Sequence, residues 1–233
     1  MNEKMENAAF FDRVRGGLIV SCQALPEEPL HGSETMAKMA RAAMLGGAAC
    51  IRANTPEDIR AIRSQVDLPV IGIIKRVYPN CDVYITPTMA EVDALYASGV
   101  EVIAMDATNR PRPAGQSPRD FFSRVREKYA DQLFMADCAT VEEGLAAAEW
   151  GFDIVATTMA GYTPASKEIS PPAFEMMEAL VKQSGKPVIA EGGIFTEEQL
   201  KRAMDTGVLA AVIGTAITRP MEITRRFVRA LVR

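Results

Sequence analysis

The chain repeats one short pattern, in which a glycine is followed at once by an apolar run. The pattern occurs as GAACIRAN from Gly47, GVEVIAMD from Gly99, GFDIVATT from Gly151 and GVLAAVIG from Gly207, with glycine spacings of 52, 52 and 56 residues. Four further apolar runs lie between or before these, at residues 17–23, 68–75, 132–138 and 186–192. Regular spacing of this kind indicates a repeated structural unit.

Each apolar run has the character of a short strand that is buried on both faces. The runs are rich in valine and isoleucine and show no alternation with polar residues, which is typical of a parallel sheet covered by helices. Helical patterns separate the runs, and several of these helices begin at a residue that can cap them: Ser33, Thr55, Thr140 and Thr196.

Eight strand-plus-helix units in 233 residues predict a (β/α)8 TIM barrel of the α/β class. A doubly wound open sheet is the alternative, and it is disfavoured because the units are regular and no second zone of composition occurs. We expect a single domain over residues 1–233, with an extra N-terminal helix at residues 4–15 that covers the bottom of the barrel.

Composition argues against several classes of protein. The formal charge is −4 and no long run carries one sign, which argues against a nucleic-acid-binding protein. No apolar run approaches the roughly 20 residues that a membrane helix needs, and the N-terminal residues lack the apolar core of a signal peptide. Four cysteines without a CxxC pair and a single histidine offer no zinc spacing. The sequence therefore predicts a cytoplasmic protein with reduced thiols and no metal site.

Function in such barrels resides at the carboxyl ends of the strands and in the loops that follow them. Taken singly, a polar residue there often marks only the exit of a strand from the core, or caps the next helix. Taken together, these residues predict one polar mouth, formed by Gln23, Arg52 with Asn54, Lys75, Asp106, Asp137, Thr158, Glu191 and Gly214.

The last two strands end in glycine-rich loops, AEGGIFT and VIGTAITRP. Glycines let backbone N–H groups approach an anion closely, and the start of a helix favours negative charge. Arg219 follows the eighth strand and can add a positive charge. The alternative is that Gly192, Gly193 and Gly214 only make tight turns, but their pairing on adjacent strands favours a phosphate site.

Lys75 and Glu191 each end an otherwise apolar strand. Burial lowers the pKa of a lysine and raises the pKa of a carboxyl group, so this pair can act as base and acid. The third and seventh strands face each other across an eight-stranded barrel, so the two side chains would flank a bound substrate, as epimerisation at a carbon atom requires. A simple salt bridge and a Schiff-base lysine are alternatives that geometry alone leaves open.

Several longer motifs carry a resemblance to one family. They include SCQALPEEPLH (21–31), PVIGIIKRVYPNCDVYITPT (69–88), VIAMDATNRPRP (102–113) and IAEGGI (189–194), and the match runs over nearly the whole chain. On these motifs the chain resembles the N-acetylmannosamine-6-phosphate 2-epimerases. The resemblance implies a homodimeric TIM barrel that interconverts N-acetylmannosamine 6-phosphate and N-acetylglucosamine 6-phosphate in amino-sugar and sialic acid breakdown.

The resemblance also implies roles for individual residues. Lys75 is then the base at C2 and Glu191 its acid partner. The TTMAGYT loop departs from the family pattern, because it has methionine where leucine-serine is more usual. His31, the sole histidine, is expected on the surface or in a loop. Substrate contacts are implied for Gln23, Arg52, Asp137, Gly161 and Tyr162, and phosphate contacts for Gly192, Gly193, Gly214, Thr215 and Arg219.

The implied chemistry requires no metal or redox cofactor. The C2 proton becomes acidic when the sugar ring opens and C1 becomes a carbonyl, and the enediolate that follows needs stabilisation, which Arg52 or protonated Glu191 can supply. The second face of C2 is served either by a second residue or by a substrate hydroxyl that relays a proton. Two other functions remain as alternatives: a Schiff-base lyase that uses Lys75, and a sugar-phosphate sensor without activity.

Overall fold

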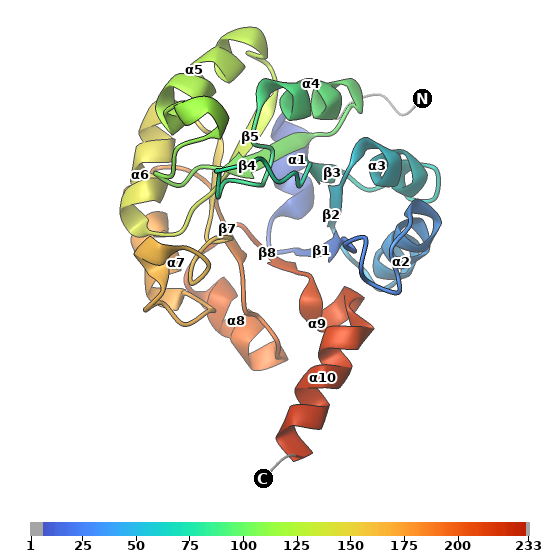
Figure 1. The fold of residues 1–233 in the computed structure, drawn as a ribbon. Helices are drawn as coiled ribbons and strands as arrows, with labels where there is room; N and C mark the ends of the chain where they lie inside the picture. Colours follow the sequence, from blue (N-terminus) through green and yellow to red (C-terminus); the bar gives the residue numbers. More distant parts are fainter. Residues whose placement is uncertain (1–6, 232–233) are drawn as a thin grey trace.

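Eight parallel strands close into a barrel in the computed structural model, which describes residues 7–231 (Figure 1). Each strand pairs with the next along the chain, and β8 pairs with β1 to close the sheet. The predicted (β/α)8 barrel is therefore confirmed. The strands are β1 (Leu18–Cys22), β2 (Cys50–Asn54), β3 (Val70–Ile73), β4 (Val102–Asp106), β5 (Leu133–Asp137), β6 (Ile154–Ala156), β7 (Val188–Glu191) and β8 (Ala210–Ile213).

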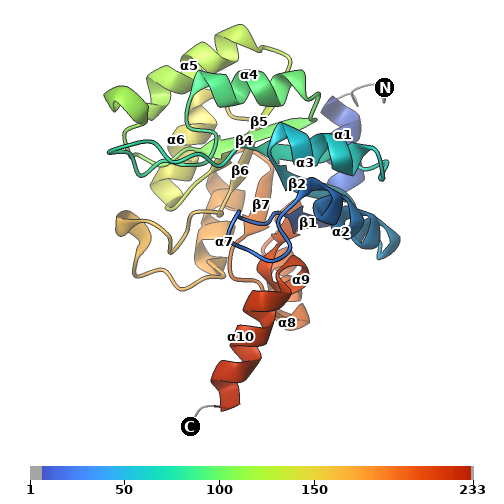
Figure 2. The same ribbon diagram turned by 45° about the vertical axis from the view of Figure 1, so that its right-hand side comes forward.

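A ring of helices covers the outside of the barrel, as Figures 1 and 2 show. Two short 3-10 turns, Pro113–Gly115 and Pro164–Ser166, lie in the loops after β4 and β6. The helices that follow the strands are α2 (Ser33–Leu45), α3 (Pro56–Arg63), α4 (Met89–Ala97), α5 (Pro118–Lys128), α6 (Val141–Trp150), α7 (Phe174–Gln183), α8 (Glu197–Asp205), α9 (Thr215–Thr218) and α10 (Pro220–Leu231).

Most of the predicted helix caps are present. The hydroxyls of Thr55, Thr140 and Thr196 each accept a hydrogen bond from a backbone N–H group in the first turn. Ser33 was predicted to cap in the same way, and this is wrong: Gly32 occupies the cap position of α2 without a side-chain bond. The Ser33 hydroxyl instead donates to Asp58 Oδ1 at 2.6 Å, which links α2 to α3.

The strands are apolar on both faces because they separate two buried layers. Alternate side chains point inward and fill the barrel, as Ile19, Cys50 and Ile71 do. The intervening side chains, such as Val20 and Val70, pack against the surrounding helices. A strand buried on both faces can place a polar side chain only near its end, and this confines the polar groups to the mouths of the barrel.

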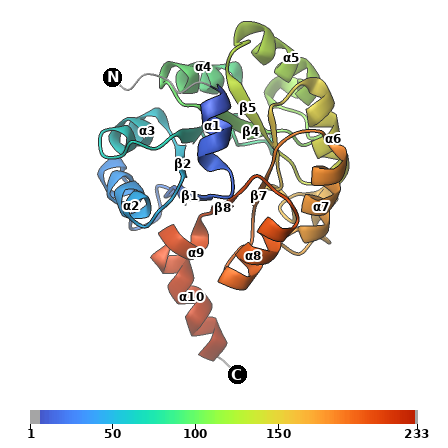
Figure 3. The ribbon, with the colours of Figure 1, turned by 180° about the vertical axis from the view of Figure 1, so that it is seen from behind.

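The N-terminal helix α1 (Asn7–Val14) closes the amino-terminal end of the barrel, where Figure 3 shows it lying across the strands. Its Phe10 and Val14 are fully buried against the inward-facing side chains. The extra helix predicted at residues 4–15 is thus confirmed over Asn7–Val14, and residues 4–6 lie outside the described residues. With this end filled, the opposite end is left for a binding site.

Helix α10 extends away from the barrel, as all three ribbon views show (Figures 1–3). It buries none of its own residues, and its apolar side chains Phe227, Val228 and Leu231 are exposed. It touches the loop after β7, where the Arg226 guanidinium lies 4.8 Å from the ring centre of Phe195. No helix within residues 7–231 has the length and apolar character needed to cross a membrane.

We expect Phe10→Ala to lower the free energy of unfolding by about 3–5 kcal/mol, because it empties a fully buried site at the closed end of the barrel. Urea unfolding followed by circular dichroism measures this loss. Phe11→Ala is the matched control, since the neighbouring ring is only partly buried and should cost clearly less. Equal losses for the two variants would show that α1 does not close the barrel through Phe10.

Candidate active site

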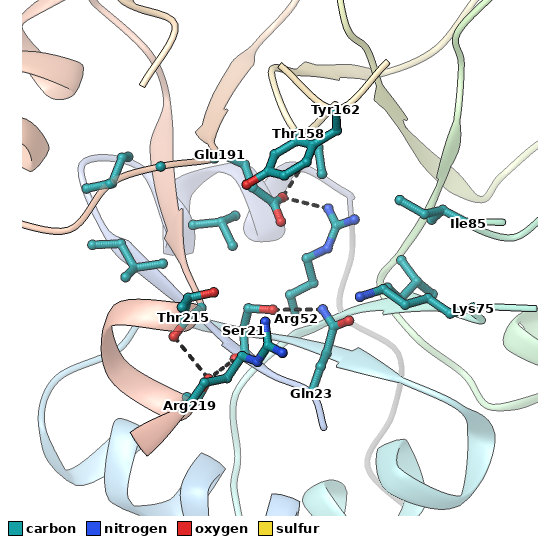
Figure 4. A pocket seen from close by; sticks show the side chains of 18 of the residues that line it. Ser21, Gln23, Arg52, Lys75, Ile85, Thr158, Tyr162, Glu191, Thr215 and Arg219 are labelled. Atoms are coloured by element: carbon teal, nitrogen blue, oxygen red, sulfur yellow. Dashed lines mark hydrogen bonds and ion pairs between the residues drawn. The ribbon is translucent and has the colours of Figure 1, made fainter. Parts of the chain in front are cut away.

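A cavity of about 300 Å³ opens at the carboxyl ends of the strands. Figure 4 shows side chains from the first to the last strand converging on it. Ten of the twelve site residues predicted from the sequence line this cavity, and Asp137 and Gly161 do not. The ten are Gln23, Arg52, Lys75, Tyr162, Glu191, Gly192, Gly193, Gly214, Thr215 and Arg219.

Arg52 links three strands at the floor of the cavity. Its guanidinium donates two parallel hydrogen bonds to the Asp137 carboxylate, Nη1 to Oδ1 at 3.1 Å and Nη2 to Oδ2 at 2.6 Å. Nη1 also donates to Glu191 Oε2 at 2.8 Å. Both Arg52 and Asp137 are almost completely buried, so Asp137 lies beneath the cavity and acts on Arg52 rather than facing the open space. Burial lowers the pKa of Arg52, but the two carboxylates raise it above its ordinary value.

Two adjacent threonines after β6 position Glu191. The Thr157 hydroxyl accepts from the Glu191 N–H at 3.1 Å and donates to the Glu191 carbonyl at 2.9 Å. The Thr158 hydroxyl donates to Asp137 Oδ1 at 2.6 Å and lies 3.2 Å from Glu191 Oε2. These bonds hold the carboxyl group at the edge of the cavity, where Figure 4 shows it directed inward.

The surroundings of Glu191 favour its protonated form. Its side chain is 15% exposed, and burial raises its pKa most strongly. The positive charge of Arg52 opposes this, whereas the negative charge of Asp137 adds to it, and the resulting pKa is about 7. Because Arg52 already forms a bidentate pair with Asp137, it compensates Glu191 only in part.

Lys75 extends into the cavity from the side opposite Glu191, as Figure 4 shows. It was predicted to end the third strand, but β3 ends at Ile73, and Lys75 forms an isolated antiparallel bridge with Ile85. Its backbone N–H donates to Asn54 Oδ1 at 2.9 Å. Burial lowers the pKa of Lys75 below its ordinary value, and the charge of Arg52 lowers it further. Within residues 7–231, Lys75 Nζ has no salt bridge.

Two of the polar strand ends turn away from the cavity. Asn54 uses its side-chain oxygen to hold the backbone of Lys75. Asp106 accepts hydrogen bonds from Thr108 and forms an ion pair with Arg110 at 2.6 Å. Neither Asn54 nor Asp106 lines the cavity, so both have the structural role that a polar residue at a strand end often has.

Glycines form the other end of the cavity, after β7 and β8. Gly192 and Gly193 have φ angles of +108° and +70°, in the region that favours glycine. Gly193 is also required for packing, since a Cβ there would lie 2.4 Å from Pro171 Cβ. Gly214 precedes the four-residue helix α9, so the first N–H groups of that helix lack intrahelical partners at the cavity wall.

The loop after β6 contributes an aromatic rim. Tyr162 lines the cavity but is 62% exposed, while Met159 reaches it as an apolar side chain. Gly161 lies outside the lining, and its φ of +82° and the nearness of Ile169 O explain why glycine occurs there. His31 is exposed in the loop after β1, as expected, and does not line the cavity.

A family model described as putative N-acetylmannosamine-6-phosphate epimerase matches residues 36–233. The chain belongs to the N-acetylmannosamine-6-phosphate epimerase family. Putative N-acetylmannosamine-6-phosphate 2-epimerases of Caldanaerobacter subterraneus subsp. tengcongensis and Clostridium perfringens (strain SM101) are 51% and 53% identical to it over 216 residues. These matches cover 93% of this chain and 91% and 97% of the two relatives.

Solved structures agree with this assignment. The N-acetylmannosamine-6-phosphate 2-epimerase from Clostridium perfringens superposes with a TM-score of 0.92 at 49% identity, covering 99% of this chain and 100% of that chain. Thiamine phosphate pyrophosphorylase from Pyrococcus furiosus, at 16% identity and a TM-score of 0.59, shares the fold alone.

In this member of the epimerase family, sequence reasoning missed several residues at or near the cavity. Thr158 was recognised as a strand end but not as a partner of Asp137 and Glu191. Glu28 lies within the motif SCQALPEEPLH, yet no pattern marked it as the partner of Arg219. Ser21 and Tyr84 also line the cavity. Ser21 stands two residues before Gln23, whereas Tyr84 lies in the long loop after β3, where no strand-end pattern marks it.

Glu191→Gln should change how the stability of the protein depends on pH. The folded pKa of about 7 lies above the ordinary value of 4.5, so unfolding releases a proton between these two values. The wild type therefore loses stability as pH rises from about 4.5 to about 7, by at most roughly 3 kcal/mol. The variant has no such carboxyl group and should gain stability relative to the wild type across this window.

Urea unfolding at pH 4.5, 5.5, 6.5 and 7.5 measures the difference. Glu197→Gln, which neutralises an exposed carboxylate in the first turn of α8, is the control and should show no comparable trend. A difference between Glu191→Gln and wild type that stays constant over this range would mean that the pKa of Glu191 is not raised in the folded protein.

Proposed function

We propose that this protein is an isomerase that interconverts N-acetylmannosamine 6-phosphate and N-acetylglucosamine 6-phosphate by proton transfer at C2. The observation that carries the proposal is the placement of Lys75 and Glu191 on opposite sides of one cavity, with Arg52 between them. Family membership supports the substrate pair, since the relatives are named for N-acetylmannosamine 6-phosphate. The reaction belongs to amino-sugar breakdown in the cytoplasm, and the four free cysteines fit a reducing compartment.

The proposed reaction begins with the open-chain sugar, whose C1 aldehyde makes the C2 proton acidic. Neutral Lys75 takes this proton, and the electron pair moves onto the C1 oxygen to form an enediolate. Burial and the charge of Arg52 lower the pKa of Lys75, which favours the neutral amine relative to an exposed lysine. Arg52 and protonated Glu191, which are hydrogen-bonded to each other in the cavity, are proposed to stabilise the negative oxygen.

Return of a proton to the other face of C2 inverts the configuration. Two routes are proposed: Glu191 donates its proton directly, or a substrate hydroxyl relays a proton from Lys75. The two routes differ in what Glu191→Gln does, because the first requires the carboxyl proton and the second requires only the hydrogen bonds that Glu191 makes.

The glycine-rich end of the cavity is the proposed phosphate site. Barrels of this type commonly bind phosphate with the loops after the seventh and eighth strands and with the start of a short extra helix. Gly192, Gly193 and Gly214 occupy these loops, and Thr215 begins the short helix α9. Arg219 supplies the positive charge for a phosphate dianion. Gln23 and Tyr162 are proposed to contact the sugar from the walls.

Lys75→Ala should reduce turnover by at least about a thousandfold and abolish deuterium uptake at C2 in heavy water, because the proposed base is lost. Proton NMR of either sugar phosphate in heavy water follows both quantities. The matched control is Lys38→Ala, which removes an exposed lysine from α2 and should leave turnover unchanged.

Other outcomes assign a different function. Turnover near wild type in Lys75→Ala would contradict the proposal. A substrate adduct trapped on Lys75 by borohydride would identify a Schiff-base lyase. Tight binding of the sugar phosphates to the wild type without exchange at C2 would identify a sensor.

We also propose that the protein acts as a homodimer and that α10 provides part of the contact. An amphipathic helix that projects into solvent with an apolar face is unstable unless something covers that face. Phe227, Val228 and Leu231 form this face, and no residue of α10 is buried within the described chain. A second copy of the same chain is the expected partner because it always accompanies the first.

Phe227→Glu should convert the dimer to a monomer at micromolar concentration, since it places a charge in the apolar contact. Sedimentation velocity measures the mass of each form. Val77→Glu introduces the same charge at an exposed apolar residue outside α10 and should leave the mass unchanged. A wild-type protein that sediments as a monomer, or a Phe227→Glu variant that sediments as a dimer, would overturn this proposal.

A further inference from the structure

A buried carboxylate lies at the end of the cavity where phosphate is proposed to bind, and negative charge is least expected there. Glu28 lies in the loop between β1 and α2, lines the cavity, and has a side chain that is 7% exposed. A carboxylate in such a place repels an incoming phosphate unless a cation neutralises it. Its position therefore requires an explanation from its contacts.

Both carboxylate oxygens of Glu28 are used. Oε2 accepts from the Leu25 N–H at 2.8 Å, and Oε1 accepts from Arg219 Nε at 2.8 Å. The Glu28 N–H donates in turn to Leu25 O at 2.9 Å, so backbone and side chain close the same turn. Burial raises the pKa of Glu28, but the Leu25 N–H and Arg219 outweigh it and hold the pKa below its ordinary value. The carboxylate is thus fixed and ionised at neutral pH.

Arg219 is held at one point and left available at another. Its Nε is engaged by Glu28, while within residues 7–231 its two Nη groups donate no hydrogen bond. A guanidinium is planar, so fixing Nε also fixes the direction of both Nη groups. Figure 4 shows the Arg219 side chain beside Ser21 and Thr215 at the cavity. The geometry presents a two-pronged donor of the kind that matches phosphate oxygens.

The backbone beside Arg219 is anchored to the same strand end. The Thr218 hydroxyl donates to Ser21 O at 2.7 Å, which ties α9 to β1. Gln23 donates to the Ser21 hydroxyl at 2.7 Å. Both the backbone and the side chain at the end of α9 are therefore positioned by the segment from Ser21 to Glu28.

We propose that Glu28 is a positioning residue for substrate phosphate, which holds Arg219 so that its Nη groups meet the phosphate of the bound sugar. This inference rests on the proposed function, because it assigns the phosphate to the same cavity. A long arginine side chain without such a partner samples many rotamers and must be ordered each time a ligand binds. Glu28 removes that cost before binding, so its loss should appear in affinity rather than in the chemical step.

The test measures kcat and KM for Glu28→Gln with N-acetylmannosamine 6-phosphate, together with the inhibition constant of inorganic phosphate. A glutamine can accept from Arg219 or from Leu25 but not from both, so one bond is lost. We expect KM and the inhibition constant each to rise about tenfold, with kcat within about twofold of wild type. Glu27→Gln, at the exposed neighbouring position, is the matched control and should change neither constant.

Two further variants separate positioning from general damage. Arg219→Lys keeps the buried carboxylate paired but loses the fork, so it should raise KM like Glu28→Gln while folding normally. In the double variant Glu28→Gln/Arg219→Lys the increases should not multiply, because both act through one group. Multiplying increases, an unchanged KM, or a fall in kcat alone would overturn the inference.

The inference can be tested separately from the proposed function. Binding of inorganic phosphate can be measured without turnover, from the rise in melting temperature that the binding causes. If the wild type binds phosphate and Glu28→Gln binds it about tenfold more weakly, the inference holds even where neither protein exchanges the C2 proton. If the wild type shows no phosphate binding at all, the inference is wrong whatever the epimerase assay shows.

Discussion

The candidate site depends on one buried guanidinium. Arg52, from β2, crosses the top of the barrel and joins Asp137 of β5 and Glu191 of β7. Three charged groups in a buried layer are tolerated only when nearly every polar atom is paired, since an isolated buried charge is very costly. The pairing therefore imposes a geometry, in which Asp137 must lie beneath Arg52 and Glu191 must approach it from the side.

In that geometry Arg52 bonds unequally to its two carboxylate partners, and this difference contributes to the proposed acid and base. Asp137 receives two bonds from Arg52, whereas Glu191 receives one, and this leaves burial as the stronger influence on the Glu191 pKa. Burial lowers the pKa of Lys75, and the charge of Arg52 lowers it further, while no carboxylate forms a salt bridge with Lys75 among the described residues. The pKa of the carboxyl group is thus raised and that of the amine lowered on opposite sides of one cavity, the directions that acid–base catalysis requires.

The regular part of the molecule was predictable, and the irregular part was not. Eight apolar runs predicted eight strands because a strand covered on both faces is a short, continuous apolar run, and Lys75 and Glu191 stood out because each ends such a run. Glu28 and Arg219 lie 191 residues apart and meet across two loops, where no period exists. The direction of α10 was not predictable either. An apolar stripe on a helix indicates that some surface packs against it, but not which surface.

The point where the barrel closes is also the point where the proposed phosphate end of the cavity is built. Strands β8 and β1 pair from Leu18 with Ala211 onward, and the chain leaving β8 turns at once into α9. Thr218 and Arg219 then bond back to Ser21 of β1 and to Glu28 in the loop that follows it. The first and last units of the barrel are thus joined by side chains as well as by the sheet. Pro220 begins α10 directly after Arg219, so the helix that projects from the barrel starts beside the end of the cavity where phosphate is proposed to bind.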